Sequence, residues 1–479
     1  MKAPQILIIG GGWAGLAAAL TATACGAQVS VWEMAPRLGG RAKSFITAEG
    51  LERDNGQHLL IGAYTECLRL MRWVGLSPEE VLVRTPLDLR LASGAGFYLP
   101  NSVRGPLQLL AGLCASGQGP GAQAWRLKER WQLLRVSWGW QRQKWRCPED
   151  QSVADLCASL PPKIIRDLIE PLCVSALNTP IAQASGQVFL RVLQEALWGG
   201  VGASDLLIPK VPLSVLWPAA AIHWLEQHGA EVHTHRRALS LLRAGEVSAS
   251  QGSSGGLGPW QVRSTVGDQH LEQNFDQVIL ACPPQEAARL LPQGLNPAWQ
   301  TSAQALRYEA IATVYLQVEG VPHGKAVLPR PMMALRTSDQ APAQFIFDRG
   351  PLGAPPGELA LVVSACSAMD RESLTLAVLN QAQQLLGSDA VLSLSPNGDL
   401  ATHSNQATRP ILTGLNLRPV HTLIEKRATF ACTPGLKRPS MAVGPQLWAC
   451  GDYVEGPFPA TLEGAVRSGV AAAEQALKR

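Results

Sequence analysis

Three glycines near the start of the chain have a spacing that suits the binding of a dinucleotide. They are Gly10, Gly12 and Gly15, and they follow the apolar residues 6–9. Gly10 allows a tight turn, Gly12 leaves room for a pyrophosphate beside the backbone, and Gly15 allows close helix packing. Glu33 stands about twenty residues further on, where a carboxylate can accept hydrogen bonds from both hydroxyls of an adenosine ribose. The pattern predicts a dinucleotide site.

The elements that must position these residues are visible in the same segment. Residues 6–9 predict a buried parallel strand, and the small residues 16–20 predict a helix. The amino terminus of that helix would offer free N–H groups and a positive dipole end to phosphate. Residues 28–32 predict a second strand, with Glu33 at its carboxyl end. A carboxylate at that position would repel a 2′-phosphate, which argues against NADP.

Further candidates lie after Glu33 and near the other end of the chain. Arg37, Gly40 and Arg41 suit a second passage of backbone along the dinucleotide. A predicted strand near the carboxyl terminus ends at Gly451 and Asp452, and a last helix is predicted to open shortly after it. Both ends of the chain are therefore expected to meet at one site.

Together these motifs resemble the flavoproteins of the amine oxidase and phytoene desaturase superfamily. The resemblance implies FAD as the cofactor and an α/β fold, in which a Rossmann-like FAD-binding domain of the glutathione-reductase type is interleaved with a mixed substrate-binding domain. Val232 would then contact adenine through its backbone, and the helix opening at Thr461 would stabilise the negative charge of the reduced flavin. The implied FAD contacts are Gly10, Gly12, Trp13, Ala14, Gly15, Glu33, Arg37, Gly40, Arg41, Gly56, Gln57, His58, Val232, Gly451, Asp452, Thr461 and Leu462.

A narrower motif occupies residues 54–64, Asp-Asn-Gly-Gln-His-Leu-Leu-Ile-Gly-Ala-Tyr. With residues 425–430 and 438–439, it resembles the squalene-associated FAD proteins, the hydroxysqualene dehydroxylases. That resemblance runs along the whole chain and implies reduction of a long-chain isoprenoid, hydroxysqualene, to squalene. One alternative is a carotenoid-type desaturase or isoprenoid oxidase, in which hydride moves the other way. A flavin amine oxidase and a non-catalytic protein that uses FAD structurally are further alternatives.

The proposed chemistry needs a proton donor, because a hydroxyl leaves readily only as water. His58 is the candidate acid or proton relay, since imidazole titrates near neutral pH and the family motif places it near the flavin. Its alternative role is structural, with the ring bonded to the backbone. Asp54 is expected to brace the following turn. No second glycine-rich fingerprint for NADPH is present in the sequence, so the electron donor is unidentified.

Composition limits the class of protein. The chain has 479 residues, of which 46% are hydrophobic and 16% charged, and a net charge of +4, which is too small to imply nucleic acid. No apolar stretch is long enough to span a bilayer, and the amino terminus does not resemble a signal peptide. The ten cysteines include no Cys-x-x-Cys pair. This pattern predicts reduced thiols in a cytoplasmic protein and no metal site.

The length predicts two interleaved domains. We expect three FAD-binding segments, residues 1–85, 206–289 and 421–479. The substrate domain would be built from residues 86–205 and 290–420.

Residues 104–146 differ from the rest of the chain because basic residues and tryptophans are interleaved there. The basic residues between its ends are Arg126, Lys128, Arg130, Arg135, Arg142 and Lys144, and the tryptophans are Trp125, Trp131, Trp138, Trp140 and Trp145. Such a segment suits peripheral contact with the inner face of the cell membrane, where indoles settle at the headgroups and cations meet anionic lipid. The alternative is an amphipathic helix whose tryptophans belong to the core.

Overall fold

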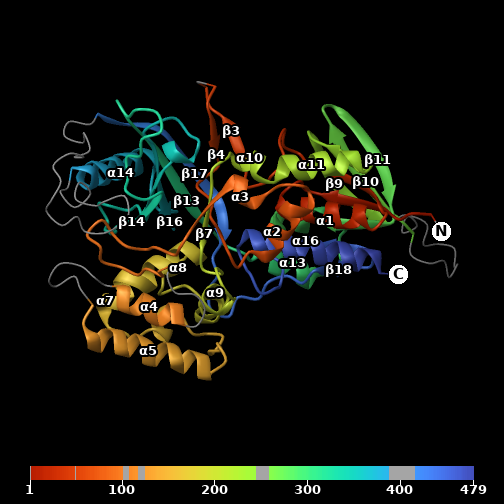
Figure 1. The fold of residues 1–479 in the computed structure, drawn as a ribbon. Helices are drawn as coiled ribbons and strands as arrows, with labels where there is room; N and C mark the ends of the chain where they lie inside the picture. The colour runs from red at the N-terminus through yellow and green to blue at the C-terminus, as the bar shows by residue number, and fades with distance from the viewer. Residues whose placement is uncertain are drawn as a thin grey trace.

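The structure is a computed structural model that describes residues 2–48, 50–100, 107–116, 125–243, 258–387 and 416–478. Figure 1 shows two lobes, each built around a sheet, with both chain termini in the same lobe. A group of helices from the first half of the chain lies beside the second lobe. No helix of the described ranges is long and apolar enough to cross a membrane.

A six-stranded sheet forms the centre of the first lobe, in the order β18-β19-β12-β1-β2-β8. Neighbouring strands are parallel from β19 to β8, and β18 is antiparallel to β19. The strands are β1 (Gln5–Ile9), β2 (Gln28–Trp32), β8 (Glu231–His233), β12 (Gln277–Leu280), β18 (Ala442–Gly444) and β19 (Leu447–Ala449). The predicted Rossmann-like sheet is confirmed, with β2 over the residues that the sequence indicated.

Both faces of this sheet are covered, which explains why the central strands β1 and β12 are apolar after their first residue. Ile6 and Ile8 pack on the side of three helices, α1 (Trp13–Ala24), α11 (Pro218–Gln227) and α16 (Leu462–Leu477). Leu7 and Ile9 point the other way because side chains alternate along a strand. They pack with a three-stranded antiparallel sheet and two helices: β9 (Arg236–Arg243), β10 (Trp260–Val266), β11 (Gln269–Phe275), α12 (Pro284–Leu290) and α13 (Pro297–Gln304).

The second lobe contains a five-stranded antiparallel sheet in the order β14-β15-β16-β13-β17. Its strands are β13 (Tyr308–Val318), β14 (Met332–Ala334), β15 (Phe345–Asp348), β16 (Glu358–Ser364) and β17 (Leu417–Phe430). Val314 and Leu316 of β13 pack with helix α14 (Arg371–Leu386). Thr313 and Tyr315 alternate with them, so they face away from α14 and toward residues 54–58, which they contact.

The helical group and the connecting elements complete the molecule. The helices are α2 (Thr65–Trp73), α3 (Pro78–Val81), α4 (Leu107–Ala115), α5 (Leu127–Arg142), α6 (Val153–Leu156), α7 (Pro162–Ile164), α8 (Glu170–Leu177), α9 (Gly186–Trp198) and α10 (Leu213–Leu216), with a π-helical turn at Ile165–Ile169 and a 3₁₀ turn at Gly350–Leu352. The short strands are β3 (Ser44–Ile46), β4 (Glu52–Asp54), β5 (Leu60–Ile61), β6 (Leu82–Thr85) and β7 (Leu206–Pro209).

One predicted domain boundary, between residues 420 and 421, divides strand β17. That strand pairs with β13 along its length up to Phe430, so the five-stranded sheet continues past the predicted boundary. The predicted break falls too early because β17 pairs with β13, a partner distant in the sequence that no local pattern marks. Residues 425–427 lie on this partly exposed strand, and Glu425 and Arg427 also reach the cleft described below. The other boundaries stay predictions.

Candidate active site

A cleft with a volume of ≈ 600 Å³ opens beyond the carboxyl ends of β1, β2 and β12, where α1 and α16 begin and where β13 and β17 reach across from the second lobe. In open parallel sheets, ligands bind in such a crevice. Twelve residues predicted to contact FAD line it: Gly10, Gly12, Trp13, Ala14, Glu33, Gly40, Arg41, His58, Gly451, Asp452, Thr461 and Leu462. Five others do not: Gly15, Arg37, Gly56, Gln57 and Val232.

The glycine turn at the end of β1 leaves room at the floor of the cleft. Gly10 has a positive φ of 113°, which a residue with a side chain rarely adopts. A Cβ on Gly15 would lie 1.9 Å from the carbonyl oxygen of Gly10, so only glycine allows the turn to close against α1. A Cβ on Gly12 would meet nothing nearer than Gly40 Cα at 3.7 Å. Gly12 and Gly40 therefore form an open cradle of bare backbone.

Glu33 is held in position by backbone amides. Its Oε2 accepts a hydrogen bond from the N–H of Gly11 and its Oε1 from the N–H of Ala35, both at 2.8 Å. Each carboxylate oxygen keeps acceptor capacity after one such bond. The side chain is thus fixed at the end of β2 while remaining able to bind hydroxyl groups.

Two predicted contact residues lie away from the lining. Val232 sits in β8 opposite Val31 of β2, so its place is in the sheet. Arg37 has a half-exposed side chain whose guanidinium lies 3.9 Å from the Glu52 carboxylate. An exposed pair of this kind contributes little to stability. Whether either residue touches a dinucleotide stays a prediction.

Arg41 joins three distant parts of the chain inside the cleft. Its Nη2 donates to Asp452 Oδ1 at 2.5 Å, and its Nη1 donates to the carbonyl oxygen of Ala428 in β17 at 2.7 Å. Burial opposes the charge of the guanidinium, but the adjacent carboxylate of Asp452 outweighs it and raises the pKa of Arg41. The cleft therefore contains a permanent cation beside a carboxylate.

The amino terminus of α16 points into the same cleft. Thr461 caps the helix, since its Oγ1 accepts a hydrogen bond from the N–H of Gly464 at 3.0 Å. Thr461 and Leu462 line the cleft, and the first N–H groups of a helix have no partner within the helix. This end of α16 can stabilise negative charge on a bound group.

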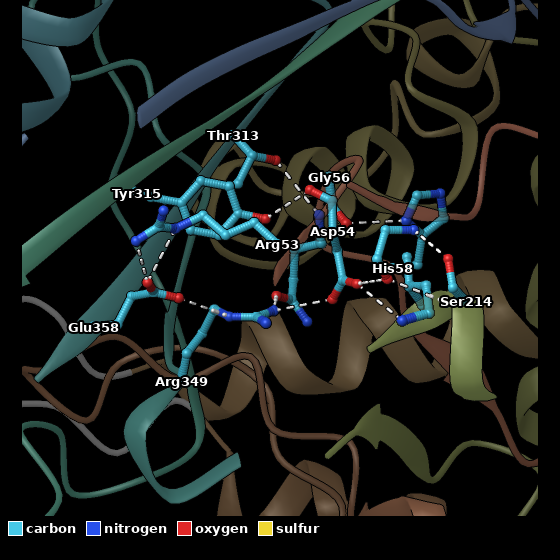
Figure 2. A network of polar contacts seen from close by, with 12 residues as sticks. Arg53, Asp54, Gly56, His58, Ser214, Thr313, Tyr315, Arg349 and Glu358 are labelled. Atoms are coloured by element: carbon cyan, nitrogen blue, oxygen red, sulfur yellow. Dashed lines mark hydrogen bonds and ion pairs between the residues drawn. The ribbon is translucent and has the colours of Figure 1, made fainter. Parts of the chain in front are cut away.

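Residues 54–58 are positioned by a buried polar network that reaches from β4 into the second lobe, and Figure 2 shows its members. Arg53 donates from Nη2 to Glu358 Oε2 at 2.9 Å, and both side chains are at most 2% exposed. Arg349 lies between carboxylates, 3.3 Å from Asp54 and 3.4 Å from Glu358. Tyr315 donates its hydroxyl to the carbonyl oxygen of Asp54 at 3.0 Å.

The same network holds Gln57 and leaves Asp54 with structural partners. Arg349 donates to Gln57 Oε1 at 2.7 Å, and the Gln57 N–H donates to the Thr313 hydroxyl at 3.4 Å. Asp54 Oδ1 accepts from the Ser44 hydroxyl and from the N–H of Leu213, each at 2.8 Å. Asp54 therefore has a structural role, but it ties together distant segments and does not brace the turn that follows it.

His58 lies in the wall of the cleft. Its Nδ1 is 3.1 Å from the carbonyl oxygen of Gly56 (Figure 2), and because a carbonyl only accepts, Nδ1 must carry the proton. Burial lowers the pKa of His58, against the opposing effect of the Gly56 carbonyl. In the neutral ring that results, Nε2 is an acceptor.

Sequence reasoning missed some of the lining. Tyr308 enters the cleft from the first residue of β13, where no motif marks it. Ala428 supplies only a carbonyl oxygen, which any residue type would offer. Tyr453, beside the Gly451–Asp452 pair, lines the cleft with a fully buried hydroxyl that has no hydrogen-bond partner among the described residues. Tyr453 was not missed, because its place after Asp452 in the sequence marked it as a residue that could line the site or simply pack.

A family model described as "Flavin containing amine oxidoreductase" matches residues 13–477. The chain belongs to this family. It is 27% identical to the hydroxysqualene dehydroxylase of Rhodopseudomonas palustris, covering 98% of this chain and 97% of that one. It is 26% identical to the hydroxysqualene dehydroxylase of Zymomonas mobilis, covering 98% of each. The predicted resemblance to these enzymes within the flavoprotein superfamily is thereby confirmed.

A solved structure agrees with the fold. The putative protoporphyrinogen oxidase from Exiguobacterium superimposes with a TM-score of 0.63 at 17% identity, covering 99% of both chains. The family confirms FAD as the cofactor and the protein as an FAD-dependent oxidoreductase. The cleft fits that group, since the Gly12–Gly40 cradle admits a pyrophosphate and the fixed Glu33 carboxylate admits a ribose. The contact of each residue with FAD stays a prediction.

Proposed function

We propose that this FAD-dependent oxidoreductase converts hydroxysqualene to squalene. In the balanced reaction one hydride and one proton enter, the carbon–oxygen bond breaks, and the hydroxyl leaves as water. The similarity over nearly the whole chain to two hydroxysqualene dehydroxylases is the observation that carries the proposal. Reduced FAD supplies the hydride when bound.

The residues of the chain would position the cofactor and handle the proton. Arg41, held by Asp452, places a fixed cation in the cleft, and the start of α16 adds a positive dipole end. Both favour a negatively charged reduced cofactor. An outside reductant must reach the flavin between turnovers.

His58 would act as a relay for the proton. Its Nδ1–H is committed to the Gly56 carbonyl, so Nε2 is the atom that accepts a proton and passes it on. The lowered pKa makes the doubly protonated ring a strong acid, suited to transient transfer and not to storage of a proton. Gln57 helps to hold the segment that sets the ring position, since its N–H donates to the Thr313 hydroxyl and its side-chain oxygen accepts from Arg349.

An anaerobic reaction tests the proposal. The flavin is photoreduced, hydroxysqualene is added in detergent, and the flavin spectrum and the lipid products are followed. We expect reoxidation of the flavin with formation of one squalene per flavin. Reduction of the oxidised flavin by squalene or phytoene would instead identify a desaturase, and reduction by a primary amine an amine oxidase.

The variant His58→Gln separates the proton role from binding. The variant should retain bound FAD, because the substitution leaves the backbone of the cleft unchanged. Its single-turnover rate should fall at least about a hundredfold, which is within the range of general acid catalysis. Full activity of this variant would remove His58 from the mechanism. If the unmodified enzyme and the variant both hold FAD and neither converts hydroxysqualene, the proposed reaction is refuted.

A further inference from the structure

Helix α5 presents an apolar face to solvent. Leu127, Trp131 and Trp138 are 85%, 70% and 62% exposed. Successive residues of a helix turn by about 100°, so these three side chains fall within about 40° of one another. We call this face, together with the cations beside it, the α5 surface.

The opposite face of the same helix is already used in the core. Leu133 and Trp140 are at most 6% exposed and belong to a large buried cluster that runs from the helical group into both lobes. They lie about 200° around the helix from Trp131 and Trp138. Trp125 and Trp145 are buried as well. Three of the five tryptophans are therefore core residues. Packing in the core does not explain the other two, Trp131 and Trp138, because they are exposed.

The charge around this face has one sign. Exposed basic residues of α5 and its two ends are Arg126, Lys128, Arg135, Arg142, Lys144 and Arg146. Residues 125–146 hold seven of the 41 lysines and arginines and one of the 37 acids of the chain, so this segment carries +6 while the whole protein carries +4. The single acid, Glu129, is engaged by the backbone N–H of Arg126.

The position of α5 leaves the surface accessible among the parts of the chain that the structure describes. Figure 1 shows α5 along the outer edge of the helical group, away from the six-stranded sheet. The guanidinium of Arg142 lies 5.5 Å from the ring centre of Trp138, so the cation and the indole lie side by side and could meet the same flat partner. Residues 104–106 and 117–124 of the predicted segment lie outside the described residues.

We propose that the α5 surface docks the protein on an anionic lipid bilayer, with the helix lying in the plane of the headgroups. Indole rings favour that depth, and the surrounding cations are attracted to the negative charge of the lipid. The charge argues for this partner, since a neutral apolar partner would leave six cations without a counter-charge. The proposal needs no particular substrate, so vesicle binding can be measured whether or not hydroxysqualene is converted.

Vesicle sedimentation with the FAD-loaded enzyme tests it. Phosphatidylcholine vesicles with about a third of phosphatidylglycerol should bind the enzyme at least tenfold more tightly than pure phosphatidylcholine. Salt should weaken the binding, since the Debye length falls to about 3 Å at 1 M. Tryptophan fluorescence should be quenched by lipids brominated near the headgroup.

Two double variants locate the contact. Arg135→Gln with Arg142→Gln should weaken binding at least tenfold, because each cation near the surface contributes about fivefold. Trp131→Ser with Trp138→Ser should also weaken binding at least tenfold, because it removes the two indoles that favour the headgroup region. All four side chains are exposed, so flavin content and melting temperature should be unchanged.

A matched control carries the same kinds of change at two exposed positions of another helix. Leu376→Ser with Arg371→Gln on α14 should bind like the unmodified enzyme. Equal binding by all the variants would overturn the proposal. So would equal binding to neutral and anionic vesicles, or no vesicle binding at all, which would point to a protein or nucleic-acid partner.

Discussion

Adding a single methyl group at Gly12 should impair cofactor binding without impairing folding. Gly12 has φ −76° and ψ −179°, a backbone conformation open to any residue, and its nearest neighbour for an added Cβ is at 3.7 Å, an ordinary contact. The apoprotein should therefore accept Gly12→Ala. The new methyl would occupy the cleft where the pyrophosphate of FAD is expected to approach.

The magnitude follows from the hydrogen bonds at risk. Displacing the pyrophosphate would lengthen at least two bonds from helix N–H groups, each worth about 1.5–3 kcal/mol because the acceptor is charged. Losing two would raise the Kd for FAD by about 10²–10⁴. Each hundredfold increase in the Kd lowers, by about 2.7 kcal/mol, the stabilisation that excess FAD gives to the folded protein.

The assay measures flavin content, titration of the apoprotein with FAD, and the melting temperature with and without FAD. Gly15→Ala is the contrasting variant, since its Cβ would lie 1.9 Å from the Gly10 carbonyl and should destabilise the apoprotein itself. Gly139→Ala in α5 is the control, because a Cβ there meets nothing within 4 Å and should stabilise the helix by up to about 1 kcal/mol. Unchanged FAD affinity in Gly12→Ala would refute the reasoning.

Three further predictions concern buried or titratable groups. Glu358→Leu should destabilise the protein by about 3–5 kcal/mol, because it leaves Arg53 charged and buried, and adding Arg53→Met should restore much of that loss in denaturant unfolding. Because burial lowers the pKa of His58 below its ordinary 6.5, the unfolded chain takes up a proton that the native state resists. The unfolding free energy should fall as the pH drops below about 6.5, and His58→Gln should remove that component. Of the ten cysteines, Cys25 and Cys114 are the exposed ones and should react first with a thiol reagent in the native enzyme.

Each of these has a contrary result. A double variant at residues 53 and 358 no more stable than the single one would show that the pair is not coupled. An unchanged pH slope in His58→Gln would assign that slope to another group. Rapid modification of most thiols without denaturant would contradict the burial of six of the remaining eight cysteines.

Local sequence was sufficient to predict those features that one short segment of the chain forms by itself. The glycine turn depends on missing Cβ atoms within six residues, and the expected ribose site depends on Glu33 standing at the end of the adjacent strand. Such features depend on backbone conformation and on neighbouring positions, so spacing in the sequence predicts them. The parallel strands and the helix start at Thr461 were predictable for the same reason.

The tertiary structure decided what surrounds those segments. Arg53 meets Glu358 across 305 residues, and Arg41 meets Asp452 across 411, and nothing in either sequence neighbourhood specifies the partner. The same holds for the five tryptophans of residues 125–146, because which of them are buried depends on how α5 and its two ends pack. Burial and long-range pairing are properties of the packed chain, because they depend on which surfaces exclude water together.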